Sequence, residues 1–108
     1  MPGSRRNARL VLCSGEREGT SFELAGDETL LGRAAGTGIT LRDDDGISRE
    51  HALILYDADS DSYSLEDLQS TNGTRVNGKR VRSVTLADGD ELCVGRTVFH
   101  FVRDNVDL

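Results

Sequence analysis

Two Asn-Gly pairs, Asn72-Gly73 and Asn77-Gly78, constrain the fold of this chain more than any other feature of its sequence. Asn-Gly is the strongest short-range signal for a tight turn that needs a positive φ. Two such turns so close together exclude a helix and leave barely enough residues for a strand between them. The surrounding segment is also dense in short donors and acceptors, namely Ser70, Thr71, Asn72, Thr74 and Asn77. A strand connection is the simpler interpretation of this segment alone, and a rigid ligand-binding loop is the alternative.

Short apolar segments recur about every eight to twelve residues, with Gly, Asn or Asp between them, and no window sustains helical periodicity. This pattern predicts an all-β sandwich or barrel. The run from Ala52 to Tyr56 is continuously apolar, which predicts a central strand buried on both faces. Alternation near the end places Leu92 with Val94 on one face, and Phe99 with Phe101 on another. The expected strands are 8–13, 20–24, 28–31, 52–56, 63–67, 84–86, 91–94 and 97–102.

Length and charge narrow the class of protein. A chain of 108 residues fits one domain, and such a domain folds without disulfides or metals. The net charge of −6 argues against nucleic acid and anionic membranes as partners. No apolar run approaches the length of a membrane span. The arginines of the middle half lie among acidic residues, so only the fold decides whether they converge. We expect a monomer.

The cysteines and histidines indicate neither a disulfide framework nor a metal site. Cys13 and Cys93 lie far apart in apolar settings, which predicts buried, reduced side chains. Without a signal peptide, a cytoplasmic location is expected. His51 and His100 are the only histidines, and no cysteine pair has ligand spacing, so no metal or cofactor is expected. The acidic run 43–45 lacks the alternation and closing Glu of a calcium loop and is interpreted as a solvated turn.

Two further segments carry side chains suited to chemistry. Arg33 follows Gly32 at the end of an expected strand, where it is either a solvated surface residue or a guanidinium aimed at an anion. Ser48 and His51, with Asp67, suggest a hydrolase triad, but the sequence contains no Gly-x-Ser-x-Gly elbow. We therefore expect His51 to hold the Ser48 turn against the segment 68–78.

Four blocks occur in a specific order along the chain. They are Leu31-Gly32-Arg33; Ile47-Ser48-Arg49-Glu50-His51; the segment 67–78 with Ser70-Thr71-Asn72-Gly73-Thr74 inside it; and the segment 86–95 around Asp88-Gly89-Asp90. This ordered set resembles the forkhead-associated (FHA) domain, and the resemblance covers about Leu10 to Val102. It implies a β-sandwich of two mainly antiparallel, twisted sheets, with ligand loops at one end that grip a phosphothreonine peptide.

The resemblance also implies roles by position. It implies phosphate contacts from Arg33, Ser48, Arg49 and Thr71. It implies that Asn72 hydrogen-bonds the peptide main chain. The implied structural supports of the site are Gly32, His51, Gly73, Asn77 and Gly78. These donors suit a phosphothreonine, which carries a charge of about −1.5 to −2 and three acceptor oxygens.

We therefore expect a non-catalytic signalling module that binds phosphothreonine-containing proteins, such as substrates of a Ser/Thr kinase. The alternative keeps the same fold but uses it for phosphate-independent protein interaction or oligomerisation. The expected organisation is a flexible N-terminal tail at 1–7, the domain at 8–103 and a short C-terminal tail at 104–108.

Overall fold

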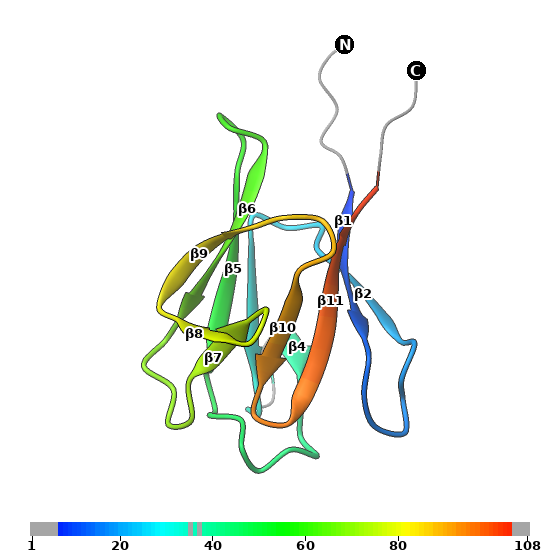
Figure 1. The fold of residues 1–108 in the computed structure, drawn as a ribbon, viewed down its shortest axis with the longest axis vertical. Helices are drawn as coiled ribbons and strands as arrows, with labels where there is room; N and C mark the ends of the chain where they lie inside the picture. The colour runs from blue at the N-terminus through cyan, green and yellow to red at the C-terminus, as the bar shows by residue number, and fades with distance from the viewer. Residues whose placement is uncertain (1–6, 35, 37, 105–108) are drawn as a thin grey trace.

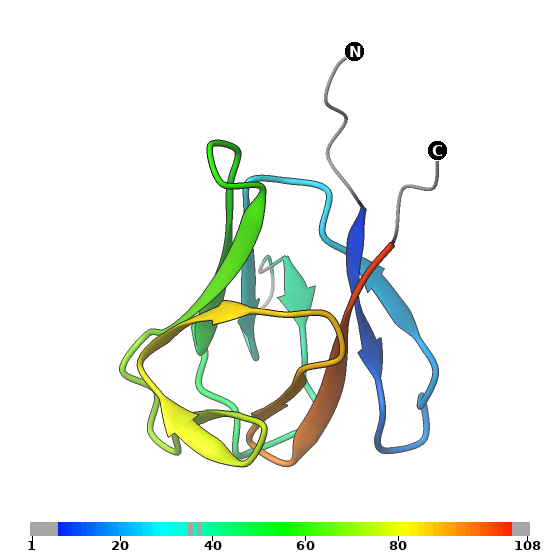
Figure 2. The ribbon, with the colours of Figure 1, turned by 45° about the horizontal axis from the view of Figure 1, so that its top comes forward.

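The computed structural model describes residues 7–34, 36 and 38–104, and it confirms the predicted β-sandwich (Figures 1 and 2). The first sheet contains, in spatial order, β2 (Ser21–Glu23), β1 (Ala8–Leu12), β11 (Thr97–Arg103), β10 (Glu91–Val94), β7 (Thr74–Val76) and β8 (Lys79–Val81). The second contains β4 (Ile39–Thr40), β3 (Glu28–Gly32), β5 (Ala52–Asp57), β6 (Ser62–Asp67) and β9 (Ser83–Leu86). The strand pairs are antiparallel except β3 with β4. No helix in the described part of the chain is long and apolar enough to cross a membrane.

The core forms where the inward faces of the two sheets meet. Alternate residues of each strand point inward, so a strand with apolar residues at every second position buries one face. The two sheets contact each other directly through Tyr63 of β6 and Phe101 of β11, whose ring centroids lie 5.5 Å apart. Leu92 is the register partner of Phe99, and both are fully buried. The expectation that β10 and β11 bury opposite faces is therefore wrong.

Three further expectations are corrected. The strand β5 is central in its sheet but buries only one face, because Ala52 and Ile54 are buried while Leu53 and Leu55 are half-buried. Sequence patterns also missed the three-residue strands β7 and β8. The cysteines are free but only half-buried. Burial is nevertheless sufficient to raise the pKa of the Cys93 thiol.

Parts of the expected tails, 1–6 and 105–108, lie outside the described residues. The flanking residues of the domain are paired, since the Asp104 amide donates to the Asn7 carbonyl oxygen at 2.8 Å. This pair continues the β1–β11 ladder at the upper end of Figure 1. The loops β4–β5 and β6–β7 lie at the opposite end, beside the end of β3. The sandwich thus gathers segments far apart in the sequence at one end.

The second Asn-Gly pair forms the tight turn between β7 and β8. Asn77 and Gly78 have φ of 53° and 83°, the signs that a type I′ turn requires at its two central residues. The Asn77 carboxamide fastens this hairpin to the neighbouring turn. Its nitrogen donates to an Asp90 carboxylate oxygen at 2.9 Å, and its oxygen accepts from the Glu91 amide at 3.0 Å.

This turn gives a direct test of backbone conformation. We expect Gly78→Ala to lower the free energy of unfolding by about 1–2 kcal/mol, the cost of placing an L-residue in the left-handed region. A Cβ atom at Gly78 would meet no heavy atom within 4 Å, so the effect is conformational rather than steric. Gly26→Ala is the control, because its φ is ordinary and its nearest contact would be 3.5 Å. Equal stability of the two variants in chemical denaturation would contradict this assignment.

Candidate functional site

A fully buried histidine joins two of the loops at this end of the sandwich. His51 Nδ1 accepts a hydrogen bond from the Ser48 amide at 3.0 Å. An accepting Nδ1 leaves the ring hydrogen on Nε2, which donates to the Gly73 carbonyl oxygen at 2.9 Å. The Ser48 hydroxyl oxygen completes the junction, since it accepts from the Thr71 amide at 3.0 Å. The Ser48 turn and the 71–73 segment therefore form one rigid unit.

This geometry removes the hydrolase interpretation of Ser48, His51 and Asp67. Both imidazole nitrogens are bonded to backbone groups, so neither faces the Ser48 hydroxyl as a general base must. The Asp67 carboxylate does not orient the imidazole either. It instead accepts from the hydroxyls of Ser70 and Thr74, at 2.5 and 2.7 Å. The grouping is a structural support for two loops.

Asp67 organises the loop that follows β6. One of its carboxylate oxygens accepts from Ser70 and Thr74 side chains, and the other accepts from the Ser70 amide at 3.1 Å. The Ser70 hydroxyl in turn accepts from the Gly73 amide at 2.9 Å. Burial raises the pKa of the Asp67 carboxyl, but the hydrogen bonds from Ser70 and Thr74 outweigh that effect, so the pKa lies below its usual value.

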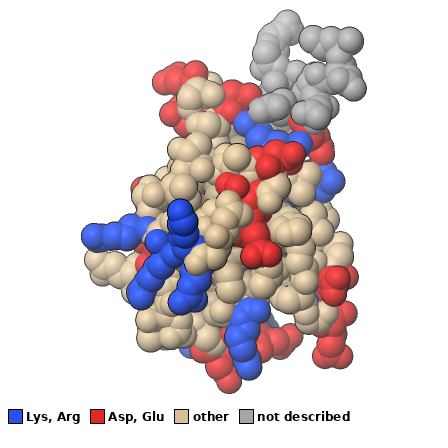
Figure 3. All heavy atoms as spheres, in the orientation of Figure 1, with Lys and Arg blue, Asp and Glu red and all other residues tan. Residues whose placement is uncertain are grey.

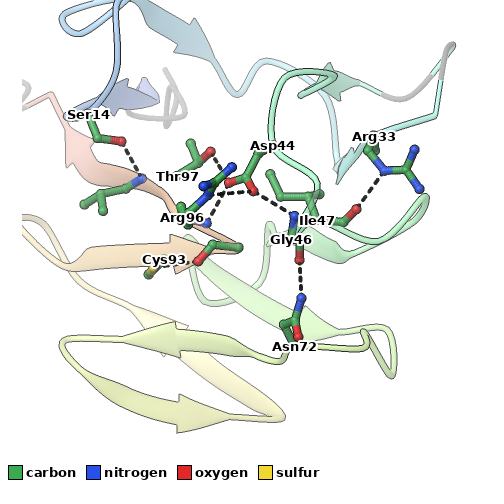
Figure 4. A network of polar contacts seen from close by, with 11 residues as sticks. Ser14, Arg33, Asp44, Gly46, Ile47, Asn72, Cys93, Arg96 and Thr97 are labelled. Carbon is green, nitrogen blue, oxygen red and sulfur yellow. Dashed lines mark hydrogen bonds and ion pairs between the residues drawn. The ribbon is translucent and has the colours of Figure 1, made fainter.

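A second carboxylate organises the loop that precedes β5. Asp44 is 6% exposed, so the interpretation of 43–45 as a solvated turn is wrong at its central residue. Figure 4 shows its carboxylate between two turns, where it accepts from the Gly46 amide at 2.9 Å and from the Arg96 amide at 2.6 Å. The Thr97 hydroxyl donates as well, at 2.8 Å. Burial raises the pKa of Asp44, but these hydrogen bonds and the Arg96 charge together hold that pKa below its usual value.

The Asp44 turn presents two carbonyl oxygens to predicted site residues, as Figure 4 shows. Arg33 Nε donates to the Ile47 carbonyl oxygen at 3.0 Å. The Asn72 carboxamide nitrogen donates to the Gly46 carbonyl oxygen at 2.9 Å. Arg33 follows β3 and Asn72 lies in the β6–β7 loop, so this turn fixes the relative position of two residues far apart in the sequence. Both residues stay exposed, and the remaining guanidinium nitrogens of Arg33 are not bonded within the described chain.

Backbone contacts place Arg33 beside the Ser48 turn. The Arg33 amide donates to the Ser48 carbonyl oxygen at 3.0 Å, and the Ala34 amide donates to the Arg49 carbonyl oxygen at 3.2 Å. A Cβ atom at Gly32 would overlap the Arg49 carbonyl oxygen, so only glycine fits there. The close approach of these two segments therefore depends on the missing side chain of Gly32.

The predicted site residues fall into an exposed group and a supporting group. Arg33, Arg49, Thr71 and Asn72 are exposed, and Ser48 is half-buried between them. The supporting group is buried at His51 and Gly73, whereas Asn77 and Gly78 lie one hairpin away, in the β7–β8 turn. Sequence reasoning missed Asp44, Ser70 and Thr74 as supports. The crowding of short polar side chains around Ser70 and Thr74 was a usable signal, but nothing in the acidic run marked Asp44.

The site is suited to an anion. Arg33 and Arg49 form no ion pair with any described residue, and Thr71 is exposed at the same rim. Guanidinium and hydroxyl donors on rigid loops match the oxygens of a phosphate or carboxylate. Among the residues that the structure describes, no group of three or more His, Cys, Asp or Glu side chains could hold a metal ion.

Comparison with models of known protein families shows the family to which the chain belongs. The FHA domain model matches residues 29–95, more than half of the chain, and this range contains Arg33, Ser48, Arg49, Thr71 and Asn72. The chain belongs to the FHA domain family. The FHA match begins within β3 and ends at the β10–β11 turn.

Individual relatives agree with this assignment. The glycogen accumulation regulator GarA of Mycobacterium tuberculosis is 38% identical over 95 residues, which cover 88% of this chain and 55% of GarA. The chain therefore spans about half the length of that relative. A structure from a study of phosphothreonine-dependent FHA domain interactions superposes with a TM-score of 0.83 at 32% identity, covering 93% of this chain and 99% of the other. EmbR of Mycobacterium tuberculosis, solved with a low-affinity phosphopeptide, gives a TM-score of 0.81 at 30% identity, covering 94% of this chain and 26% of EmbR.

The lowered pKa of Asp67 predicts a pH-dependent contribution to stability. The ionised carboxyl stabilises the folded chain above about pH 3.9, the unfolded-state pKa, and this contribution is lost as the pH falls through the folded-state pKa. We expect Asp67→Asn to lower the free energy of unfolding at pH 7. The difference from wild type should shrink below about pH 4, where the wild-type carboxyl becomes protonated.

Urea denaturation at a series of pH values measures this difference. Asp59→Asn is the control, because Asp59 is exposed in the β5–β6 turn at the other end of the sandwich. We expect the control to follow wild type across the whole range. A constant difference between wild type and Asp67→Asn from pH 7 to pH 3 would show that the Asp67 charge does not stabilise the loop.

Proposed function

We propose that this chain is a non-catalytic module that binds phosphothreonine-containing proteins through the loops β4–β5 and β6–β7 and the end of β3. The observation that carries the proposal is the junction of Arg33, Ser48 and Thr71 at one rim of the sandwich. Their positions are fixed by the Ile47 carbonyl contact of Arg33 and by the Ser48 hydroxyl contact of the Thr71 amide. The phosphothreonine-dependent interactions of the superposed FHA structure support the same ligand class.

Each exposed donor has a distinct task in this proposal. Arg33 and Arg49 supply positive charge, and the Ser48 and Thr71 hydroxyls supply neutral hydrogen bonds to the remaining phosphate oxygens. Asn72 contacts the peptide main chain. Its carboxamide nitrogen is already bonded to Gly46, so its oxygen is the atom that accepts from a peptide amide. The net charge of −6 is compatible, because distant charges are screened beyond about 8–10 Å.

The pocket is built before the ligand arrives. His51 and both organising carboxylates, Asp44 and Asp67, fix the loops through hydrogen bonds within the protein. A ligand therefore does not have to order these loops, and less of the binding free energy is spent on conformational entropy. The same rigidity suits a protein that reads the presence of a phosphate without transforming it.

Removal of the Arg33 guanidinium tests the proposal most directly. We expect Arg33→Ala to weaken binding of a phosphothreonine peptide about 10- to 100-fold, because hydrogen bonds to charged groups contribute about 1.5–3 kcal/mol. Calorimetric titration of an oriented phosphothreonine peptide library, followed by single peptides, measures the change. The unphosphorylated peptide should bind neither protein.

Arg17→Ala is the matched control, because Arg17 is an exposed arginine in the β1–β2 connection, outside the proposed pocket. We expect its affinity to equal that of wild type. Equal binding of phosphorylated and unphosphorylated partner would instead favour phosphate-independent interaction through another surface of the sandwich.

Substitution of Asp44 should weaken phosphopeptide binding although Asp44 itself does not contact the ligand in this proposal. In Asp44→Asn a carboxamide nitrogen replaces one of the two acceptor oxygens. Either the Gly46 amide, or the Arg96 amide together with the Thr97 hydroxyl, then loses its acceptor. We expect roughly tenfold weaker phosphopeptide binding, which corresponds to about 1.4 kcal/mol. The adjacent, exposed Asp45→Asn is the control. Unchanged affinity in Asp44→Asn would show that the turn does not position Arg33 and Asn72.

A further inference from the structure

The β7–β8 hairpin carries a concentration of positive charge that the proposed phosphate site does not use. Four exposed residues form this basic patch: Arg75, Lys79, Arg80 and Arg82. Arg75 and Arg80 are register partners across the hairpin, so their side chains leave the same face of the sheet. Figure 3 shows lysine and arginine side chains gathered over this hairpin.

The two paired arginines repel each other. Like charges directly opposite on neighbouring strands destabilise a sheet, and within the described part of the chain no residue of the basic patch forms an ion pair. Some other arginines of the chain do form ion pairs. Arg9 meets Asp104 at 2.5 Å, and Arg103 meets Asp61 at 3.0 Å. An unpaired basic patch in a chain of net charge −6 indicates a place for an external anion.

The basic patch lies directly behind the ligand-facing loop. An atom at the position of a Gly73 Cβ would be only 2.5 Å from Arg80 Nε, so this guanidinium packs against the backbone next to Asn72. A groove beside the loop is lined by Gln69, Ser70, Arg80 and Arg82, and also by the carboxylates of Glu66 and Asp67. Asp67 is already bonded to Ser70 and Thr74, so Glu66 is the one lining carboxylate without such contacts among the described residues.

We propose that the basic patch binds an anionic side chain that lies a few residues from the phosphothreonine in the same partner. This inference rests on the function proposed above. An extended peptide advances about 3.3 Å per residue, so a chain that contacts Asn72 reaches Arg80 within a few residues. An anion between Arg75 and Arg80 removes their repulsion and offers oxygens to two guanidinium groups. The preferred partner therefore carries a second anionic group close to its phosphothreonine.

The anion can be a carboxylate or a second phosphate, since both present the oxygens that guanidinium groups bind. Three series of peptides separate these sources. Each contains one phosphothreonine, and the residue placed two, three or four positions away on either side is Asn, Asp or phosphoserine. A larger gain from phosphoserine than from Asp identifies a doubly phosphorylated partner, and equal gains identify an acidic one.

Calorimetry of these peptides tests the proposal. We expect wild type to bind the best acidic peptide about three- to tenfold more tightly than its Asn counterpart, as one or two exposed charge pairs allow. We expect Arg75→Gln/Arg80→Gln to lose this preference and to bind the Asn peptide like wild type. Arg17→Gln removes an exposed arginine that lies outside both the basic patch and the proposed binding loops, and it should keep the preference.

The outcomes separate the two proposals. Binding of the Asn peptide by wild type reports on the phosphothreonine pocket alone, whereas the acidic preference reports on the basic patch. An absent preference in wild type, or one that persists in Arg75→Gln/Arg80→Gln, overturns the inference and leaves the pocket intact. Two further measurements do not require the peptide affinity of a variant. The wild-type preference should fall as salt rises, and the melting temperature of the double variant should equal or exceed that of wild type.

Discussion

The two hydrogen bonds of the buried His51 imidazole are the interactions on which the arrangement of the candidate site depends. The imidazole accepts from the Ser48 backbone and donates to the Gly73 backbone, so it ties a loop of one sheet to a loop that enters the other. A neutral imidazole is suited to this task because it is a donor and an acceptor at opposite edges of one rigid ring. Besides the imidazole, the two loops share a backbone hydrogen bond from Leu68 to His51 and two hydrogen bonds at the exposed rim, where water competes.

Two carboxylates extend this junction outward. Asp67 organises the loop after β6, and Asp44 fastens the loop before β5 to the β10–β11 turn. Each uses several short hydrogen bonds from backbone and hydroxyl groups, which is how a protein keeps a partly buried charge ionised. The exposed residues of the candidate site are thus the outermost layer of a network built from a buried imidazole and two carboxylates.

Much of the fold, and the residues of the candidate site, could be predicted from the sequence. Alternation marked the longer strands, and the four ordered blocks placed Arg33, Ser48 and Asn72 together. The short strand β7 was missed because its outward residue is a charged Arg75 and only two residues point inward. Asp44 was misread because its burial comes from Arg96 and Thr97, more than fifty positions away, and no local pattern records such partners.

Gly32 determines which parts of the candidate site can be changed by protein engineering. The exposed side chains of Arg49 and Thr71 form no described hydrogen bond within the chain, so they can be exchanged without disturbing the core. The floor of the same site has no such freedom, because the Arg49 carbonyl oxygen occupies the space that any Gly32 side chain would need. New ligand specificities can therefore be grafted onto this sandwich by rewriting the loop tips, provided that the crossing point beneath them stays without a side chain.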